Sequence, residues 1–129
     1  MNVILMVLLP AVVKPLLGSF NHEAVAVDPI HKKLYLTEDA PSGLFYKFEP
    51  SASDWPEGAD RPALEDGRLY AFQADGVGTD FTTPRTGTWV EIANPENPGG
   101  LGFSTASQAP SATTFNGGEG IWYHEGLIY

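Results

Sequence analysis

The chain has 129 residues, of which 43% are hydrophobic and 18% are charged, the composition of a single globular domain. Its 16 acidic and 7 basic residues give a net charge of −9, which argues against binding nucleic-acid phosphates through a basic patch. The chain contains no cysteine, which excludes disulfide bonds, zinc–thiolate sites and a cysteine nucleophile. The acidic excess has two interpretations: general surface solubility, or carboxylate clusters that hold a hard cation such as Ca²⁺.

Residues 3–17 form the strongly apolar stretch of the sequence. Two prolines and a lysine interrupt it, and it is too short for a membrane-spanning helix of about 20 residues. It also lacks the charged start and the A-x-A cleavage site of a secretory signal peptide. A degraded export signal, a buried strand and a misplaced start codon all stay open. Residues 1–19 are therefore set apart as an apolar N-terminal segment, and residues 20–129 are expected to form the domain.

After Ser19 the sequence consists of short apolar runs that are separated by turn residues. The 14 glycines and 11 prolines favour such short elements over long helices. Turn signals follow the first run at Asp28-Pro29, and Pro50 is expected to close the third run because proline cannot donate to a sheet ladder. The runs predicted as strands are 23–28, 34–38, 43–48, 67–72 and 88–92. The stretches predicted as loops are 51–66, 73–87 and 94–113.

The C-terminal residues repeat the pattern of the first hairpin. Residues 119–123 and 127–129 are predicted as strands joined by a turn, and the unit that begins at Gly118 resembles the unit that begins at His22. Four short strands followed by the start of a similar unit are typical of a β-propeller blade and its neighbour. The sequence therefore predicts an all-β fold, a partial β-propeller of about one four-stranded antiparallel blade plus the start of the next.

Acidic residues lie at the ends of these predicted strands. Glu23 begins the first strand, Glu38 and Asp39 end the second, and Glu119 begins the repeated unit. If the innermost strands of neighbouring blades line a channel, Glu23 and Glu119 point at one axis. Converging carboxylates repel one another unless a cation lies among them, so these positions predict a hard-metal site. The alternative is that the acids at the strand ends are simply solvated, since carboxylates are mostly exposed in proteins.

Four segments resemble the PhoX-type alkaline phosphatases, and they occur in the same order and with similar spacing. The segments are FNHEAVAVDP (20–29), LYLTEDAPSGLFYKFEP (34–50), GRLYAF (67–72) and GEGIWYHEGLIY (118–129). The resemblance implies a β-propeller that is exported to the periplasm or secreted. It also implies hydrolysis of phosphate monoesters at a metal cluster that contains Ca²⁺ and iron.

The resemblance extends to individual residues. Glu23 of the H-E-A motif, Glu38 of T-E-D and Glu119 of E-G-x-W match metal-binding acids of the family, with Asp39 as a further candidate. No catalytic residue is assigned. The iron site of the family needs a cysteine, which this chain lacks, so Ca²⁺ is the cofactor expected here and iron is implied by the resemblance alone.

The expected function is that of a fragment of a metal-dependent phosphomonoesterase that is inactive by itself, because further blades would supply the other ligands. The alternative is a non-enzymatic β-propeller or Ca²⁺-binding interaction module that has kept the scaffold. The expected partners are small phosphate monoesters, with no nucleic acid and no membrane span. An incomplete propeller is also expected to self-associate through its uncovered strand edges.

Overall fold

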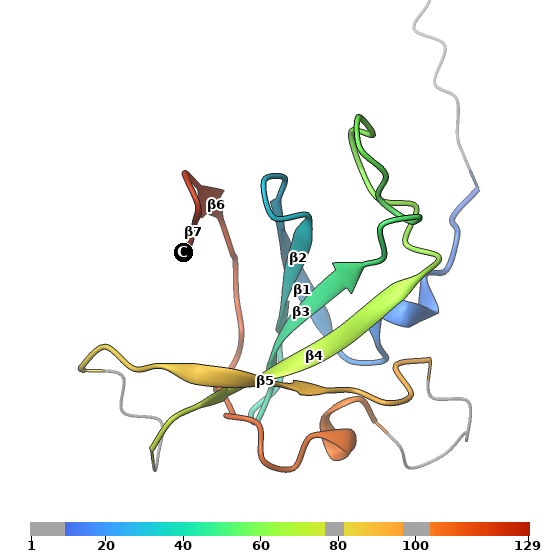
Figure 1. The fold of residues 1–129 in the computed structure, drawn as a ribbon. Coiled ribbons are helices and arrows are strands. Elements are labelled where there is room, and N and C mark those ends of the chain that lie inside the picture. The colour runs from blue at the N-terminus through green and yellow to red at the C-terminus, as the bar shows by residue number, and fades with distance from the viewer. Residues whose placement is uncertain (1–9, 77–81, 97–103) are drawn as a thin grey trace, which may run out of the picture.

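The computed structural model describes residues 10–76, 82–96 and 104–129, and within these ranges its main feature is a five-stranded antiparallel sheet (Figure 1). The strands are β1 (His22–Asp28), β2 (Lys33–Glu38), β3 (Phe45–Pro50), β4 (Gly67–Ala74) and β5 (Gly87–Glu91). Each strand pairs with its neighbour in sequence, in the order β1-β2-β3-β4-β5. The all-β class and the antiparallel meander are confirmed. The fifth predicted run joins the same sheet, which therefore has one strand more than the predicted blade.

The boundaries of β3 differ from the predicted ones by two residues at each end. Gly43 stands outside the strand and makes an isolated bridge with Phe115, whereas Pro50 is the last strand residue and pairs with Gly67. The β2–β3 ladder already ends at Phe48, so the missing N–H of Pro50 removes no hydrogen bond on that side. The strand does end at Pro50, as expected, but its predicted last residue, 48, was two residues too early.

The C-terminal hairpin is shorter than predicted. It consists of β6 (Tyr123–His124) and β7 (Leu127–Ile128), and Glu119 lies outside any strand. Glu125 and Gly126, the two residues between the strands, have φ of 47° and 87°, as the tight turns favoured in hairpins require. The repeated unit thus keeps the hairpin but not the long first strand, and Glu23 and Glu119 do not hold equivalent strand positions.

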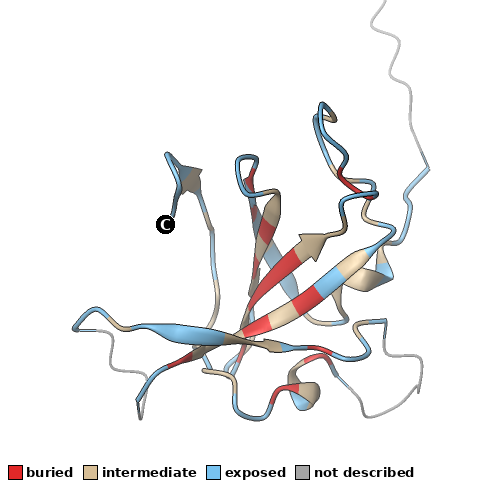
Figure 2. Cartoon of the chain, in the orientation of Figure 1, coloured by how far each residue is buried: buried red, intermediate tan, exposed pale blue. Residues whose placement is uncertain are grey.

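One face of the sheet carries the hydrophobic core, which appears as the buried segments of β2, β3 and β4 in Figure 2. The buried side chains that the central strands contribute are Leu34, Leu36, Tyr46, Phe48, Leu69 and Ala71. Trp55 from the loop between β3 and β4 covers this face, together with Ala109 just after the 3₁₀ helix η2 (Ala106–Gln108). The period of two in strands explains the arrangement, because alternate residues share a face.

The apolar N-terminal segment contributes to this core from residue 16 onward. Leu16 and Leu17, in the 3₁₀ helix η1 (Pro15–Leu17), are partly buried against it. Residues 1–9 of the segment lie outside the described residues, as do 77–81 and 97–103 of the two predicted loops. Neither of the short 3₁₀ helices in the described ranges is long and apolar enough to cross a membrane.

The opposite face of the sheet carries a cluster of aromatic side chains. Tyr35, Phe45, Phe72 and Trp89 come from four adjacent strands, and their rings lie 5.3–6.4 Å apart between centroids. We call these four residues the aromatic face. The same face also carries charged side chains, among them Lys33, Glu49 and Arg68, as antiparallel sheets with one solvated face usually do.

Candidate functional site

The four acids predicted as metal ligands lie near one end of the β1–β2 hairpin. Glu23 belongs to β1, Glu38 is the last residue of β2, and Asp39 follows it directly. His22 pairs with Glu38 across the two strands, so Glu23 is adjacent to that pair in sequence. Glu119 approaches the same end from the C-terminal segment, because its backbone carbonyl accepts a hydrogen bond of 2.7 Å from the Thr37 hydroxyl.

Glu38 differs from the other three acids because it is buried, with 8% of its surface exposed. Its Oε2 atom accepts hydrogen bonds from the backbone N–H of Leu44 at 2.8 Å and from the hydroxyl of Tyr46 at 3.1 Å. Burial, together with the charge and hydrogen bond of Glu38, raises the pKa of Tyr46 far above its usual range. Tyr46 therefore stays protonated, and its hydroxyl donates a hydrogen bond to the carboxylate. One oxygen of Glu38 is thus already engaged by neutral donors inside the protein.

Glu23, Asp39 and Glu119 are exposed. Across residues 10–76, 82–96 and 104–129, no group of three or more His, Cys, Asp or Glu side chains lies close enough to hold a metal ion. The carboxylates of these residues therefore do not form a metal-binding group by themselves. The assignment of Glu23, Glu38, Asp39 and Glu119 as ligands stays a prediction.

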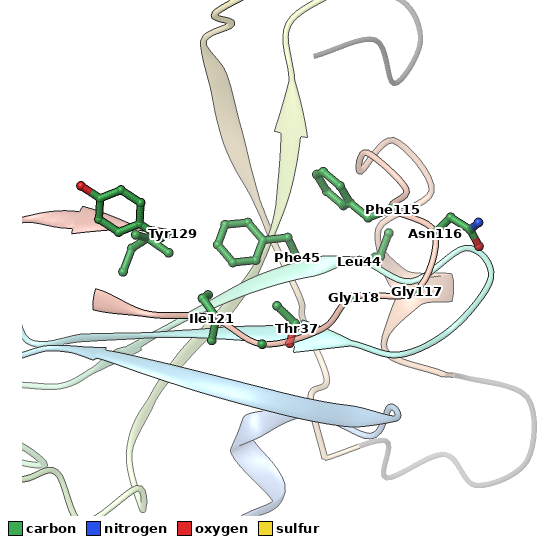
Figure 3. Close-up of a pocket in the computed structure, with 11 residues that line it drawn as sticks. Thr37, Leu44, Phe45, Phe115, Asn116, Gly117, Gly118, Ile121 and Tyr129 are labelled. Carbon is green, nitrogen blue, oxygen red and sulfur yellow. The ribbon is translucent and has the colours of Figure 1, made fainter. Parts of the chain in front are cut away.

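A groove lies beside these acids, between the sheet and the C-terminal segment. Its volume is about 520 Å³, within the range of small-molecule sites. Phe45 of β3 and Leu44, the residue before this strand, line one side, and Phe115, Ile121 and Tyr129 line it from the C-terminal segment. Figure 3 shows the ring of Phe45 extending from β3 toward the side where Ile121 and Tyr129 lie. The groove is mainly apolar, and sequence analysis missed it because its two walls are far apart in the chain.

The turn between β1 and β2 is organised by another buried carboxylate, Asp28. It accepts hydrogen bonds from the backbone N–H groups of Ile30 and His31 at 3.0 Å, and its other oxygen lies 2.7 Å from Nδ1 of His31. Burial acts to raise the pKa of Asp28, but these hydrogen bonds outweigh it, so the pKa is lowered. The arrangement closes a tight turn and leaves His31 paired, which argues against a ligand-binding role for this histidine.

A second pair of charges lies on the side of the sheet that carries the aromatic face. Lys47 is buried, donates to Glu49 at 2.7 Å, and lies 4.6 Å from the ring centroid of Trp89 and 5.0 Å from that of Tyr70. Burial acts to raise the pKa of Glu49, whereas hydrogen bonds from Lys47 and Lys33 lower it and prevail. This cluster was not predicted. The signal was present in the alternation of β3, which places Lys47 on the same face as Phe45.

The described residues thus form an all-β protein built on an antiparallel meander. One face of this sheet carries the hydrophobic core, and the other carries a cluster of aromatic side chains. The sequence model of the family described as alkaline phosphatase PhoX matches residues 10–129. The chain belongs to the PhoX alkaline phosphatase family. No curated protein and no solved structure matches the chain.

Proposed function

We propose that this chain forms one of several packed sheets in a protein of the PhoX family that hydrolyses phosphate monoesters. The family match over residues 10–129 is the observation that carries this proposal, because it extends over nearly the whole chain. Hydrolysis of small phosphate monoesters is the activity that the family name implies. The meander of the described residues is consistent with one blade of a β-propeller, with β5 as an additional strand.

The aromatic face supports a role for the sheet as an inner layer. Tyr35, Phe45, Phe72 and Trp89 are only partly buried, and they come from four adjacent strands. Exposed apolar area of this kind marks a contact surface in soluble proteins. In a propeller each blade packs against two neighbours, so both faces of a blade are apolar. The proposal thus explains why this sheet has large apolar side chains on both faces.

We propose further that Glu23, Asp39 and Glu119 bind Ca²⁺ weakly in this chain and tightly only when a neighbouring sheet adds ligands. Their exposure leaves their carboxylates accessible, and Ca²⁺ needs six to eight oxygen ligands, more than these residues can supply. Export to the periplasm or beyond belongs to the same proposal, as does iron in the complete site. A non-enzymatic Ca²⁺-binding module is the second candidate, favoured by the internal hydrogen bonds of Glu38 and the absence of cysteine.

Calcium titration of the purified chain tests this assignment. We expect weak binding, with a Kd of about 10⁻⁴–10⁻³ M, because few protein ligands are available. Glu23→Gln and Glu119→Gln should each weaken the binding, since an amide oxygen carries no charge. Glu57→Gln is the matched control, because Glu57 is an exposed acid in the loop between β3 and β4. Isothermal titration calorimetry gives the measurement.

Equal Ca²⁺ affinity in all four proteins would contradict the ligand assignment and leave the acids as solvated surface residues. The same samples should release no p-nitrophenol from p-nitrophenyl phosphate, with or without Ca²⁺. Turnover by this chain would overturn the requirement for a neighbouring sheet. Ca²⁺ binding without turnover, in a preparation that contains the neighbouring sheets as well, would favour the non-enzymatic module.

We also expect the purified chain to associate as its concentration rises. Its exposed apolar side chains include Trp122 and Tyr129 of the C-terminal segment, in addition to Val25 and Val27. Sedimentation velocity should show a growing fraction of larger species, and Val25→Lys should reduce it because a charge resists burial. Lys33→Arg keeps the charge on an adjacent strand and is the control. A monomer at every concentration, with a sharp thermal transition, would show that the sheet needs no neighbour.

A further inference from the structure

Glu38 lies at the point where the end of β2, the turn after it and the C-terminal segment meet. Its side chain accepts the hydrogen bonds from Leu44 and Tyr46 described above. Its backbone carbonyl accepts two more, from the N–H groups of Ala40 at 3.2 Å and Gly118 at 3.0 Å. One residue therefore connects β2, β3 and the C-terminal segment.

Two glycines allow the chain to approach Glu38 this closely. A Cβ atom on Gly43 would lie 2.4 Å from the Glu38 carbonyl oxygen, and one on Gly118 would lie 2.7 Å from the same atom. Both distances are shorter than real Cβ contacts, and the atom that is met belongs to the backbone and cannot move aside cheaply. Gly120, two residues after Gly118, would meet nothing within 4 Å. The close approach is thus confined to Gly43 and Gly118 in this region.

The C-terminal segment is attached to the turn that Glu38 organises. The N–H of Phe115 donates to the carbonyl of Gly43 at 2.8 Å, and the N–H of Gly117 donates to that of Ala40 at 2.9 Å. Both acceptors lie in the turn between Glu38 and Leu44, whose far end is held by the Glu38 carboxylate. The position of these carbonyls therefore depends on the buried side chain of Glu38.

We propose that Glu38 is a positioning residue: its carboxylate fixes the 39–44 turn, the turn holds residues 115–118, and the groove forms as a result. The groove has one wall on each side of this attachment, with Leu44 at the end of the turn and Phe45 of β3 on one side, and Phe115 and Ile121 of the segment on the other. The role depends on the hydrogen bonds of Glu38 and not on a bound cation. It is independent of the proposed phosphatase function.

Amide hydrogen exchange measured by NMR tests the proposal, with no metal added. In Glu38→Ala, exchange should accelerate about tenfold or more at Phe115, Gly117 and Gly118, because their acceptors are no longer held in place. The amide of Ile92, which donates to Leu69 at 2.8 Å in the core, should be unaffected. Glu38→Gln should restore most of the protection, since its amide oxygen can still accept from Leu44 and Tyr46.

Gly118→Ala examines the same attachment from the other side and does not disturb the buried carboxylate. We expect it to accelerate exchange at Phe115 and Gly117, whereas Gly120→Ala should leave both unchanged. Equal exchange rates at Phe115 and Gly117 in Gly118→Ala and Gly120→Ala would overturn the proposal. So would a Glu38→Gln variant as fast as Glu38→Ala, because a loss that only the charge can repair requires a different role for Glu38.

Discussion

Replacing Phe48 by alanine is expected to lower the free energy of unfolding by about 3–5 kcal/mol. Phe48 lies in the middle of β3, is fully buried, and pairs with Leu34 on one side and Leu69 on the other. Its ring also fills the space beside Gly67, where an added Cβ would lie 2.6 Å from the ring. Truncation therefore removes contacts in three strands at once and leaves a cavity that the sheet cannot close.

Urea unfolding monitored by circular dichroism provides the measurement. Phe48→Leu retains part of the volume and should cost less than the alanine variant, because the remaining cavity is smaller. Val27→Ala on the exposed side of β1 should stay within about 0.5 kcal/mol of the wild type. A Phe48→Ala variant as stable as Val27→Ala would show that the described core does not support the sheet.

The sequence allowed the five main strands to be predicted because apolar runs and turn residues alternate clearly in this region. Asp28-Pro29 marks the β1–β2 turn, and the structure shows the side chain of Asp28 bound to the backbone of that turn. The ends of strands were less predictable. Pro50 ends β3 as expected, but the strand includes Pro50 because its partner Gly67 in β4 is still paired there, and this pairing is not visible in a single segment.

The candidate site was harder to predict because sequence position does not show which acids are buried. Glu38 shares the parity of Leu34 and Leu36 in β2, so the period of two already indicated a buried side chain. Its interpretation as a channel ligand gave more weight to its place at the strand end than to its face. Glu119 was assigned by analogy with Glu23, whereas the structure places it in a connection outside the strands.

The loop between β3 and β4 shows a second limit of sequence reasoning. Residues 51–66 are polar and contain two prolines, and no periodicity marks any of them as structural. The loop nevertheless folds back over the core with Trp55 buried beneath it, and the indole N–H donates to the carbonyl of Ala59 at 2.9 Å. Its order comes from specific contacts between residues four to twelve positions apart, which composition cannot indicate.

Asp54 is the residue that holds this loop, and its replacement by alanine should destabilise the protein by about 3 kcal/mol. The buried carboxylate accepts from the backbone N–H groups of Leu64, Glu65 and Asp66 at 2.7–3.0 Å. Leu64 also has a φ of 62°, in the left-handed region that leucine rarely adopts, so the hydrogen bonds hold a strained backbone. In the alanine variant, three backbone N–H groups lose their acceptor. Nothing then offsets the backbone strain at Leu64, and the loop should unfold locally.

Asp54→Asn keeps the size of the side chain but removes one of its two acceptor oxygens. The amide oxygen can take the place of Oδ1, which serves Glu65 and Asp66, but the NH₂ group cannot accept from Leu64. We therefore expect a loss about half as large as for alanine, measured by urea unfolding. Asp60→Ala removes an exposed carboxylate from the same loop and should change stability by less than about 0.5 kcal/mol. If Asp54→Ala behaves like Asp60→Ala, the carboxylate does not hold the loop, and its order must come from its other contacts, such as the burial and hydrogen bond of Trp55.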